Sequence, residues 1–198
     1  MKFSIVAALG LAAIAHAQPV ANSIEPRLVN IKLGGKGSNG ADKSPFSFTS
    51  TYSLYATPEE VVDSNNAFTG GLAGASGVYK FGINSRDNII CYNITLSSFQ
   101  GEYQSPAISA THIHEAPRGR AGPPRIAFPN PVEIGPSLRS SIGCIRGPFT
   151  TGVLANGKDT GEGFHVKQIE ENPAAFFADV HSSLAVPGAV RGQLEKKC

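Results

Sequence analysis

The sequence predicts an all-β protein, an antiparallel β-sandwich with Greek-key-like connections and one or two short helices. Three observations predict this fold class. Short runs rich in aromatic and β-branched residues recur along the chain, and turn-forming residues separate them at frequent intervals. A chain of 198 residues can bury one substantial core, so we expect one main domain.

Residues 1–17 have the pattern of a secretory signal peptide. Lys2 supplies a positive charge, an apolar run follows, and Ala15 and Ala17 satisfy the small-residue rule for cleavage after Ala17. Cleavage after Ala15 is the alternative. The apolar run is too short to span a bilayer, so we expect a secreted, extracellular protein with no membrane span.

The remaining chain divides into a leader, a domain and a tail. Residues 18–45 are poor in aromatic residues and rich in turn formers, so we expect a flexible leader. The folded domain is expected at residues 46–195 and a short tail at residues 196–198. The formal net charge is only +2, and this balance gives no reason to expect a nucleic-acid partner.

The strands and helices of this domain are expected in a definite order. Strands are predicted at residues 46–55, 77–83, 88–96, 110–115, 174–181 and 189–194. One short helix should begin at Thr57, with Pro58 in its first turn and Glu60 completing a capping box. A second short helix is expected within residues 166–173.

Proline and glycine mark the expected loops and turns. The chain should turn at residues 84–87 and again at residues 186–189. Residues 117–131 are expected to form a proline- and glycine-rich loop. Residues 128–151 should also be mostly loop, because Pro129, Pro131, Pro136 and Pro148 interrupt them.

The cysteines indicate one disulfide. Secretion places Cys91, Cys144 and Cys198 in an oxidising compartment, where an odd number leaves one cysteine unpaired. We favour Cys91–Cys144, because Cys198 is at the chain end, which usually frays. Cys144 is expected in a glycine-flanked loop. Cys144–Cys198 is the alternative pairing.

Asn93 begins an Asn-Ile-Thr acceptor for N-glycosylation. On a strand, Cys91 would share the solvent-facing side of Asn93, where its thiol could meet a surface loop.

Three histidines form a candidate metal site. His112 and His114 form a His-x-His pair, and on a strand their side chains point the same way, ~6–7 Å apart. His181 ends another predicted strand. Three converging imidazoles suit copper, with zinc as the alternative. His165 lies beside the second helix, shares no face with the pair, and is expected on the surface.

Two further residues are candidates for a supporting role at this site. Asp179 shares side-chain parity with His181 and could orient that ring from behind, or it could be a solvated strand residue. Arg191 could pair with Asp179, guide an anion to the site, or form a structural ion pair. The sequence assigns no catalytic residue. Three basic residues follow the histidine pair, Arg118, Arg120 and Arg125. We expect them to be ordinary surface residues that keep the protein soluble.

Several stretches resemble the CHRD domain, the module named from the chordin proteins and found in secreted fungal and bacterial proteins. They are residues 111–116, 122–128 and 176–194, and the resemblance as a whole runs from about Phe48 to Leu194. It implies a β-sandwich. Most members of this family have no assigned biochemical activity.

A weaker resemblance connects the histidines with copper–zinc superoxide dismutases, which also carry a His-x-His strand, a late Val-His and an arginine near the chain end. The metal-bridging histidine and the zinc-binding cluster of those enzymes have no counterpart here. Two hypotheses follow. The favoured one is a secreted module that binds an extracellular protein or glycan and possesses a metal site, and the alternative is a small copper-dependent redox enzyme.

Overall fold

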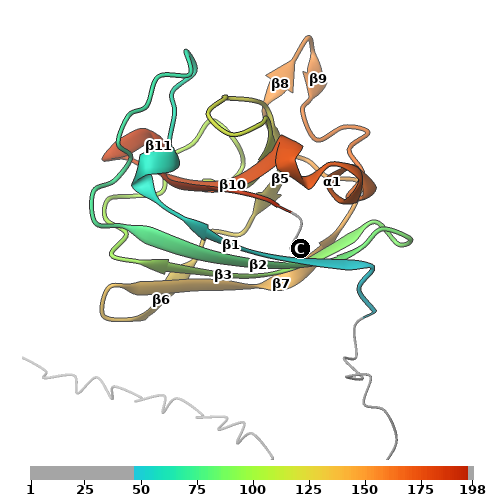
Figure 1. Ribbon diagram of the computed structural model, residues 1–198, viewed down its shortest axis with the longest axis horizontal. Coiled ribbons are helices and arrows are strands. Elements are labelled where there is room, and N and C mark those ends of the chain that lie inside the picture. The colour runs from blue at the N-terminus through green and yellow to red at the C-terminus, as the bar shows by residue number, and fades with distance from the viewer. Residues whose placement is uncertain (1–46, 196–198) are drawn as a thin grey trace, which may run out of the picture. The chain divides into compact units, whose positions relative to one another are not determined.

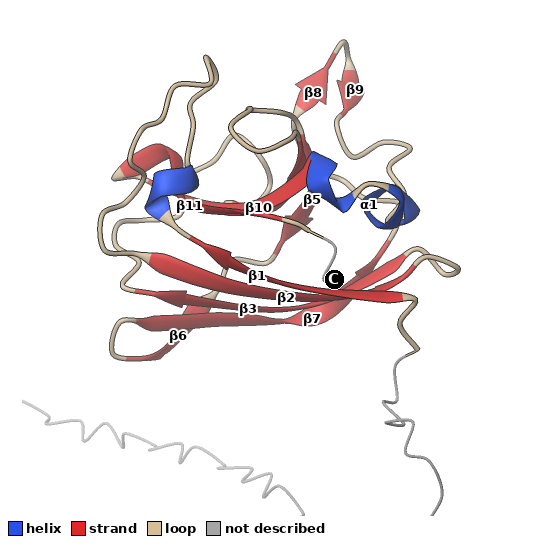
Figure 2. Ribbon diagram, viewed as in Figure 1, coloured by secondary structure: helices blue, strands red, loops and turns tan. Residues whose placement is uncertain are grey.

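Two antiparallel sheets face each other in the protein and form a β-sandwich, as the sequence predicts (Figures 1 and 2). The structure is a computed structural model, and it describes residues 47–195. The expected signal peptide, the leader and the tail with Cys198 lie outside the described residues. Within residues 47–195 no helix is long and apolar enough to cross a membrane.

The larger sheet has five strands in the order β1-β2-β3-β7-β6. Their bounds are Ser50–Ala56 (β1), Ser76–Asn84 (β2), Ile89–Ser97 (β3), Val132–Gly135 (β6) and Leu138–Arg146 (β7). The chain leaves this sheet after β3 and returns later, so that β7 lies beside β3. This is a Greek-key-like connection.

The smaller sheet has four strands in the order β11-β10-β4-β5. Their bounds are Thr111–Glu115 (β4), Pro124–Phe128 (β5), Phe176–Ser182 (β10) and Ala185–Gln193 (β11). A separate two-stranded hairpin joins Leu154–Ala155 (β8) to Lys158–Asp159 (β9). The helical turns are Pro58–Glu60 (η1), Lys167–Glu171 (α1) and Pro173–Ala175 (η2).

Alternation along the strands explains why the two sheets pack together. In β3 every second side chain is buried between the sheets, and these residues are Ile90, Tyr92, Ile94 and Leu96. Asn93, between them, is exposed on the outer face. From the smaller sheet, Ile113, Ile126 and Phe128 complete the same core.

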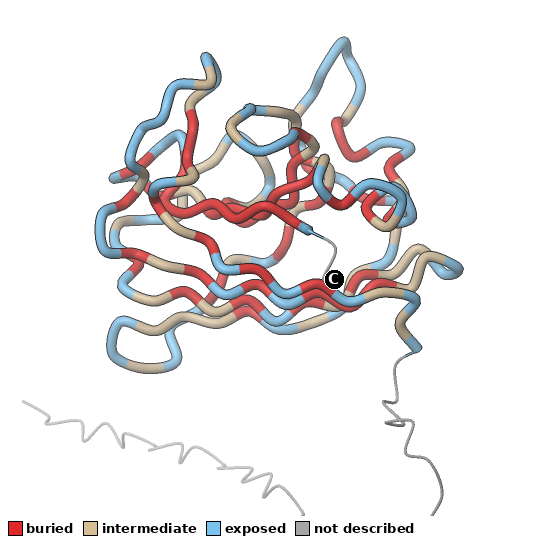
Figure 3. The backbone as a smooth tube through the Cα atoms, in the orientation of Figure 1, coloured by how far each residue is buried: buried red, intermediate tan, exposed pale blue. Residues whose placement is uncertain are grey.

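The two central strands of the smaller sheet, β4 and β10, are buried on both of their faces (Figure 3). In β4, Ile113 packs into the core, while His112 and His114 lie on the opposite face and are also buried. Loops around Val62 and Ala121 line that opposite face. A polar strand face under loops is a setting for a site, because it keeps ionisable groups away from bulk water.

The prediction that residues 128–151 are mostly loop is wrong. β6 and β7 both lie there, and β7 pairs with β3 over nine residues. The prolines stand at the ends of strands and in turns, with Pro136 between β6 and β7 and Pro148 beyond β7. A proline removes a backbone donor only at its own position, so it limits a strand without excluding one nearby.

Three local expectations are also corrected. Residues 117–131 are not a continuous loop, because β5 begins at Pro124 and pairs with β4. The turn expected at residues 186–189 lies earlier, at Ser183 and Leu184, and Pro187 and Gly188 belong to β11. The helix at Thr57 is a single 3-10 turn, and the Thr57 side chain makes no capping hydrogen bond. The helix expected within residues 166–173 is confirmed as α1.

The disulfide joins Cys91 to Cys144, and the favoured pairing is therefore confirmed. Cys144 lies on β7, directly opposite Cys91 on β3, and not in a loop as expected. Both cysteines lie on the same outer face as Asn93. The expected parity of β3 correctly placed the bond on that face.

Candidate metal centre

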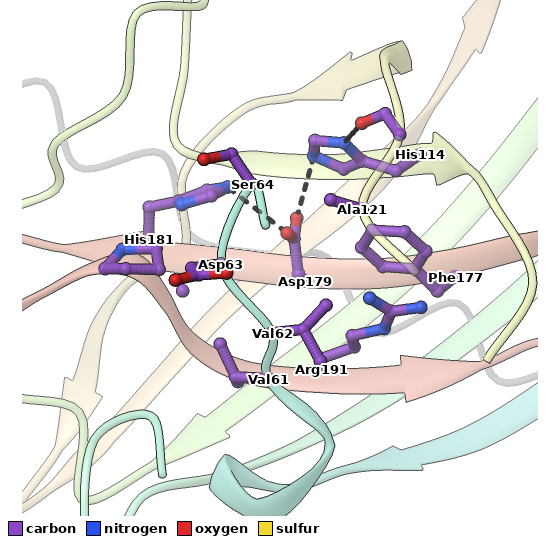
Figure 4. Close-up of a pocket in the computed structure, with 13 residues that line it drawn as sticks. Val61, Val62, Asp63, Ser64, His114, Ala121, Phe177, Asp179, His181 and Arg191 are labelled. Carbon is purple, nitrogen blue, oxygen red and sulfur yellow. Dashed lines mark hydrogen bonds and ion pairs between the residues drawn. The ribbon is translucent and has the colours of Figure 1, made fainter. Parts of the chain in front are cut away.

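Two neighbouring strands supply the side chains of the candidate centre (Figure 4). β4 contributes His112 and His114, and β10 contributes Asp179 and His181. In the antiparallel register Asp179 lies directly opposite His112. Beyond that pairing, the backbone N–H of His181 donates to the carbonyl of Ala110 at 2.8 Å, which keeps His181 beside the start of β4.

The four side chains bring their donor atoms close together. His112 Nδ1 and His114 Nε2 are 3.4 Å apart, and Asp179 Oδ1 lies 3.6 Å from the first and 3.4 Å from the second. His181 Nε2 lies 3.2 Å from Asp179 Oδ2. All four donor atoms lie within 4.8 Å of one another. Ligands at bond lengths of 2.0–2.1 Å around a tetrahedral ion are about 3.3 Å apart, so these separations suit one first-row ion.

Hydrogen bonds orient all three rings in the same sense. In each imidazole the nitrogen that faces away from the group bonds to a backbone carbonyl. The pairs are His112 Nε2 with Ser109 at 2.7 Å, His114 Nδ1 with Gly122 at 2.8 Å, and His181 Nδ1 with Val186 at 2.9 Å. A carbonyl only accepts, so each outer nitrogen carries the proton and each inner nitrogen of a neutral ring presents a lone pair.

Asp179 is the most constrained member of the group. Asp179 is only 4% exposed, and its Oδ1 atom makes no hydrogen bond within residues 47–195. Burial alone would raise the pKa of its carboxyl group, but the neighbouring rings of His114 and His181 hold that pKa well below the usual range. A buried, ionised carboxylate without a hydrogen bond at one oxygen requires a nearby cation.

The rings respond differently to this carboxylate. Burial lowers the pKa of His112. The contact with Asp179 and its negative charge act to raise this pKa, but they do not overcome the effect of burial. For His181 burial also acts to lower the pKa, but the charge of Asp179 and its contact with the ring raise the pKa to about 9. At neutral pH the metal-free group therefore holds a proton on His181, facing Asp179.

Arg191 and Phe177 support one side of the group. The ring of His114 stacks on Phe177 with 4.9 Å between centroids, and the guanidinium carbon of Arg191 lies 3.5 Å from the centroid of the same Phe177 ring. Arg191 donates to the carbonyls of Arg120 at 2.8 Å and Pro117 at 3.1 Å. It thus holds the loop after β4. No ion pair joins Arg191 to Asp179 in the described part of the chain.

A cavity of about 220 Å³ adjoins the group. His114, Asp179 and His181 form part of its wall. Val61 and Val62, from the segment after η1, form an apolar wall near Asp179 (Figure 4). His112 does not line the cavity and is 1% exposed. One side of the group therefore faces an opening, and the opposite side is packed.

His165 and the basic residues after the histidine pair lie outside the group. His165 Nδ1 accepts from the backbone N–H of Lys167 in the first part of α1, at 3.1 Å. Glu115 forms an ion pair with Arg125 at 2.7 Å. Arg118 forms ion pairs with the carboxylates of Glu60 and Glu195.

Sequence reasoning did not identify two parts of the site. The carbonyls of Ser109, Gly122 and Val186 orient the rings, but a backbone acceptor leaves no residue-type signal. The apolar wall at Val61 and Val62 directly follows the single 3-10 turn at Pro58–Glu60, where the sequence predicts the start of a short helix. Asp179 was expected behind His181, and its carboxylate lies among the three rings.

The fold and the site together define an antiparallel β-sandwich protein with a buried group of three histidines and one aspartate. The CHRD domain matches residues 52–194, most of the chain, and the chain belongs to this family. The matched residues include all four members of the group. No match to the chain is found among curated proteins or among solved structures.

Proposed function

We propose that this chain is a secreted, non-enzymatic CHRD-type module that binds one first-row metal ion through His112, His114, Asp179 and His181. The observation that supports the proposal best is the orientation of the donors. The inner nitrogens of His112 and His114 and Asp179 Oδ1 face one another at 3.4–3.6 Å, and Oδ1 has no hydrogen bond to any described residue. Acceptors at such distances repel unless a cation lies between them.

Copper and zinc both fit three imidazoles and one carboxylate. Four protein donors fill the coordination of tetrahedral zinc, and closed sites of this kind are typical of zinc that stabilises a fold. A bound ion would join β4 to β10. It would thereby stabilise the loops that cover this face, because backbone carbonyls of these loops accept hydrogen bonds from the histidine rings.

Secretion and an extracellular partner belong to the same proposal. The signal-peptide pattern of residues 1–17 supports secretion, and the disulfide between Cys91 and Cys144 suits an oxidising compartment. The partner in this proposal is an extracellular protein or glycan.

Metal analysis of the full chain, purified without a histidine tag, tests the proposal. We expect one copper or zinc ion per chain. His114→Gln and His181→Gln should lose most of the binding, while His165→Ala should retain it. Circular dichroism establishes that each variant is folded. A copper or zinc titration that is the same for wild type and a folded His114→Gln variant would contradict the site.

The cavity favours a second candidate, a small copper-dependent redox enzyme. Three of the four donors face the opening, so a small oxygen species could approach from that side. Arg191 is less suited to guide an anion, because two of its donors are bonded to loop carbonyls. With unbound copper removed by a chelator, copper-loaded protein that consumes superoxide no faster than metal-free protein would exclude dismutation, and loss of catalysis in His114→Gln would support it.

A further inference from the structure

Asn93 presents an unusual acceptor for modification on the face opposite the metal group. Asn93-Ile94-Thr95 is the only Asn-x-Ser/Thr tripeptide in the sequence. Asn93 lies in the middle of β3, the central strand of the five-stranded sheet, and is exposed. Its side-chain amide makes no hydrogen bond to any residue in 47–195. The amide nitrogen is therefore free to carry a sugar in the folded protein.

The surface around Asn93 is more apolar than a solvated sheet face requires. Ile142 of β7 lies directly opposite Asn93 and is 71% exposed. On the other side, Lys80 of β2 lies opposite Asn93, and the exposed Val78 is one step further along that face. Residues directly opposite on an antiparallel pair have Cβ atoms about 5 Å apart. A sugar on Asn93 would thus contact Ile142.

The edge of the same sheet adds to the exposed apolar surface. β6 is the edge strand, and its Val132 and Ile134 are exposed. An edge strand with apolar side chains and free backbone groups is prone to pair with another copy of the chain. β7, with Ile142, is the only strand between this edge and Asn93.

We propose that Asn93 carries an N-linked glycan whose core sugars lie over Ile142 and shield the outer face of the five-stranded sheet from contact between copies of the chain. Three features support a glycan at this position. They are the Asn-Ile-Thr acceptor, the position of Ile142 directly across from Asn93, and the signal-peptide pattern. The metal group lies on the other sheet. The glycan and the metal group are therefore independent, and failure of one proposal leaves the other intact.

The first test is the mass of the full chain secreted by a eukaryotic host. Treatment with peptide-N-glycosidase F should lower the mass by that of a glycan. Asn93→Gln and Thr95→Ala should each lack the glycan, while Ser53→Ala, on the same outer face but outside the tripeptide, should keep it. An unmodified Asn93 in the secreted protein would overturn the proposal.

The second test measures the shielding. Enzymatic removal of the glycan from the folded protein should increase the binding of a hydrophobic dye and the fraction of dimer or larger species in sedimentation. Ile142→Ser should suppress both increases. Removal of the glycan without either change would overturn the shielding role. Because the enzyme acts on protein that has already folded, this result does not depend on secretion of Asn93→Gln, and unchanged metal content in treated protein would verify that the two sites are independent.

Discussion

A single carboxylate connects the three imidazoles of the candidate centre. Asp179 lies 3.4 Å from His114 and 3.2 Å from His181, and its own pKa falls well below the usual range as the pKa of His181 rises to about 9. In the metal-free protein, a proton on His181 partly neutralises this carboxylate. A metal ion would take the place of that proton, because a coordinating imidazole must give up the proton on the nitrogen that binds.

Metal binding should therefore release a proton at neutral pH. We expect release of about one proton per ion between pH 7 and 8, because the pKa of His181 is about 9. The apparent affinity should rise about tenfold per pH unit from pH 7 to 9. Calorimetric titration in buffers of different ionisation enthalpy measures the proton count. A proton count near zero at pH 7.5 would contradict a protonated His181.

The same groups predict how the stability of the metal-free protein depends on pH. The raised pKa of His181 gives stability that is complete below pH 6.5 and is lost as pH rises through about 9. The lowered pKa of Asp179 gives stability that is present above about pH 4 and is lost as pH falls through the folded-state value. In the presence of a chelator, the thermal unfolding temperature should decline from pH 8 to 10. This decline should be smaller in His181→Gln.

At the scale of elements, the loop after β4 fixes the orientation of His114. Gly122 lies where a Cβ atom would be 2.0 Å from the carbonyl oxygen of Glu115 and 2.9 Å from the Cβ atom of Ala116. Its own carbonyl accepts from His114 Nδ1. Only glycine allows this close approach of the loop to the end of β4.

Gly122→Ala should therefore weaken metal binding and lower the unfolding temperature. The backbone must shift away from Glu115, and His114 then loses the acceptor that orients its ring. Loss of such a supporting contact typically costs 10–100-fold in metal affinity, so we expect a decrease of about tenfold or more. Gly135→Ala is the matched control, because a Cβ atom there meets nothing within 4 Å. Equal affinities for the two variants would contradict this role for Gly122.

The disulfide between β3 and β7 is the second element-scale feature. It joins residues 53 positions apart and so constrains the unfolded chain. Replacing Cys91 and Cys144 together by serine should lower the free energy of unfolding by about 3–4 kcal/mol, which denaturant titration measures. Cys198→Ser should leave the midpoint unchanged. If the double variant at Cys91 and Cys144 unfolds at the same denaturant concentration as the wild type, the bond contributes nothing to stability.

For the molecule as a whole, the described residues 47–195 contain a hydrophobic core between the two sheets. We expect a fragment of residues 46–195 to unfold in one transition, at the temperature of the full chain, and to bind metal equally well. At an ion concentration one hundredfold above the dissociation constant, the ion should stabilise both proteins by about 2.7 kcal/mol. Scanning calorimetry with ion and with chelator measures both effects. A lower transition in the fragment would show that residues outside it contribute to the domain.

The sequence by itself determined the fold class and part of the site, and it favoured the disulfide that the structure has. Alternation with a period of two residues is a local signal, and it correctly placed Asn93 and Cys91 on one face of β3. The same periodicity correctly placed His112 and His114 on a shared face of β4. The cysteine count and the position of Cys198 at the chain end favoured Cys91–Cys144 over Cys144–Cys198, and the structure confirms the favoured pairing.

Only the tertiary structure decided that β10 lies between β11 and β4 and so pairs with β4 along one of its edges. That pairing brings Asp179 opposite His112 and places His181 beside the pair. It also decided that β7 is a strand, since its partner β3 lies about fifty residues earlier in the chain. Strand pairing and loop coverage depend on contacts between distant residues, and the orientation of each ring depends on a backbone carbonyl that any residue could supply. No local pattern of residue types encodes these contacts, so they follow from the packing of the two sheets and their loops.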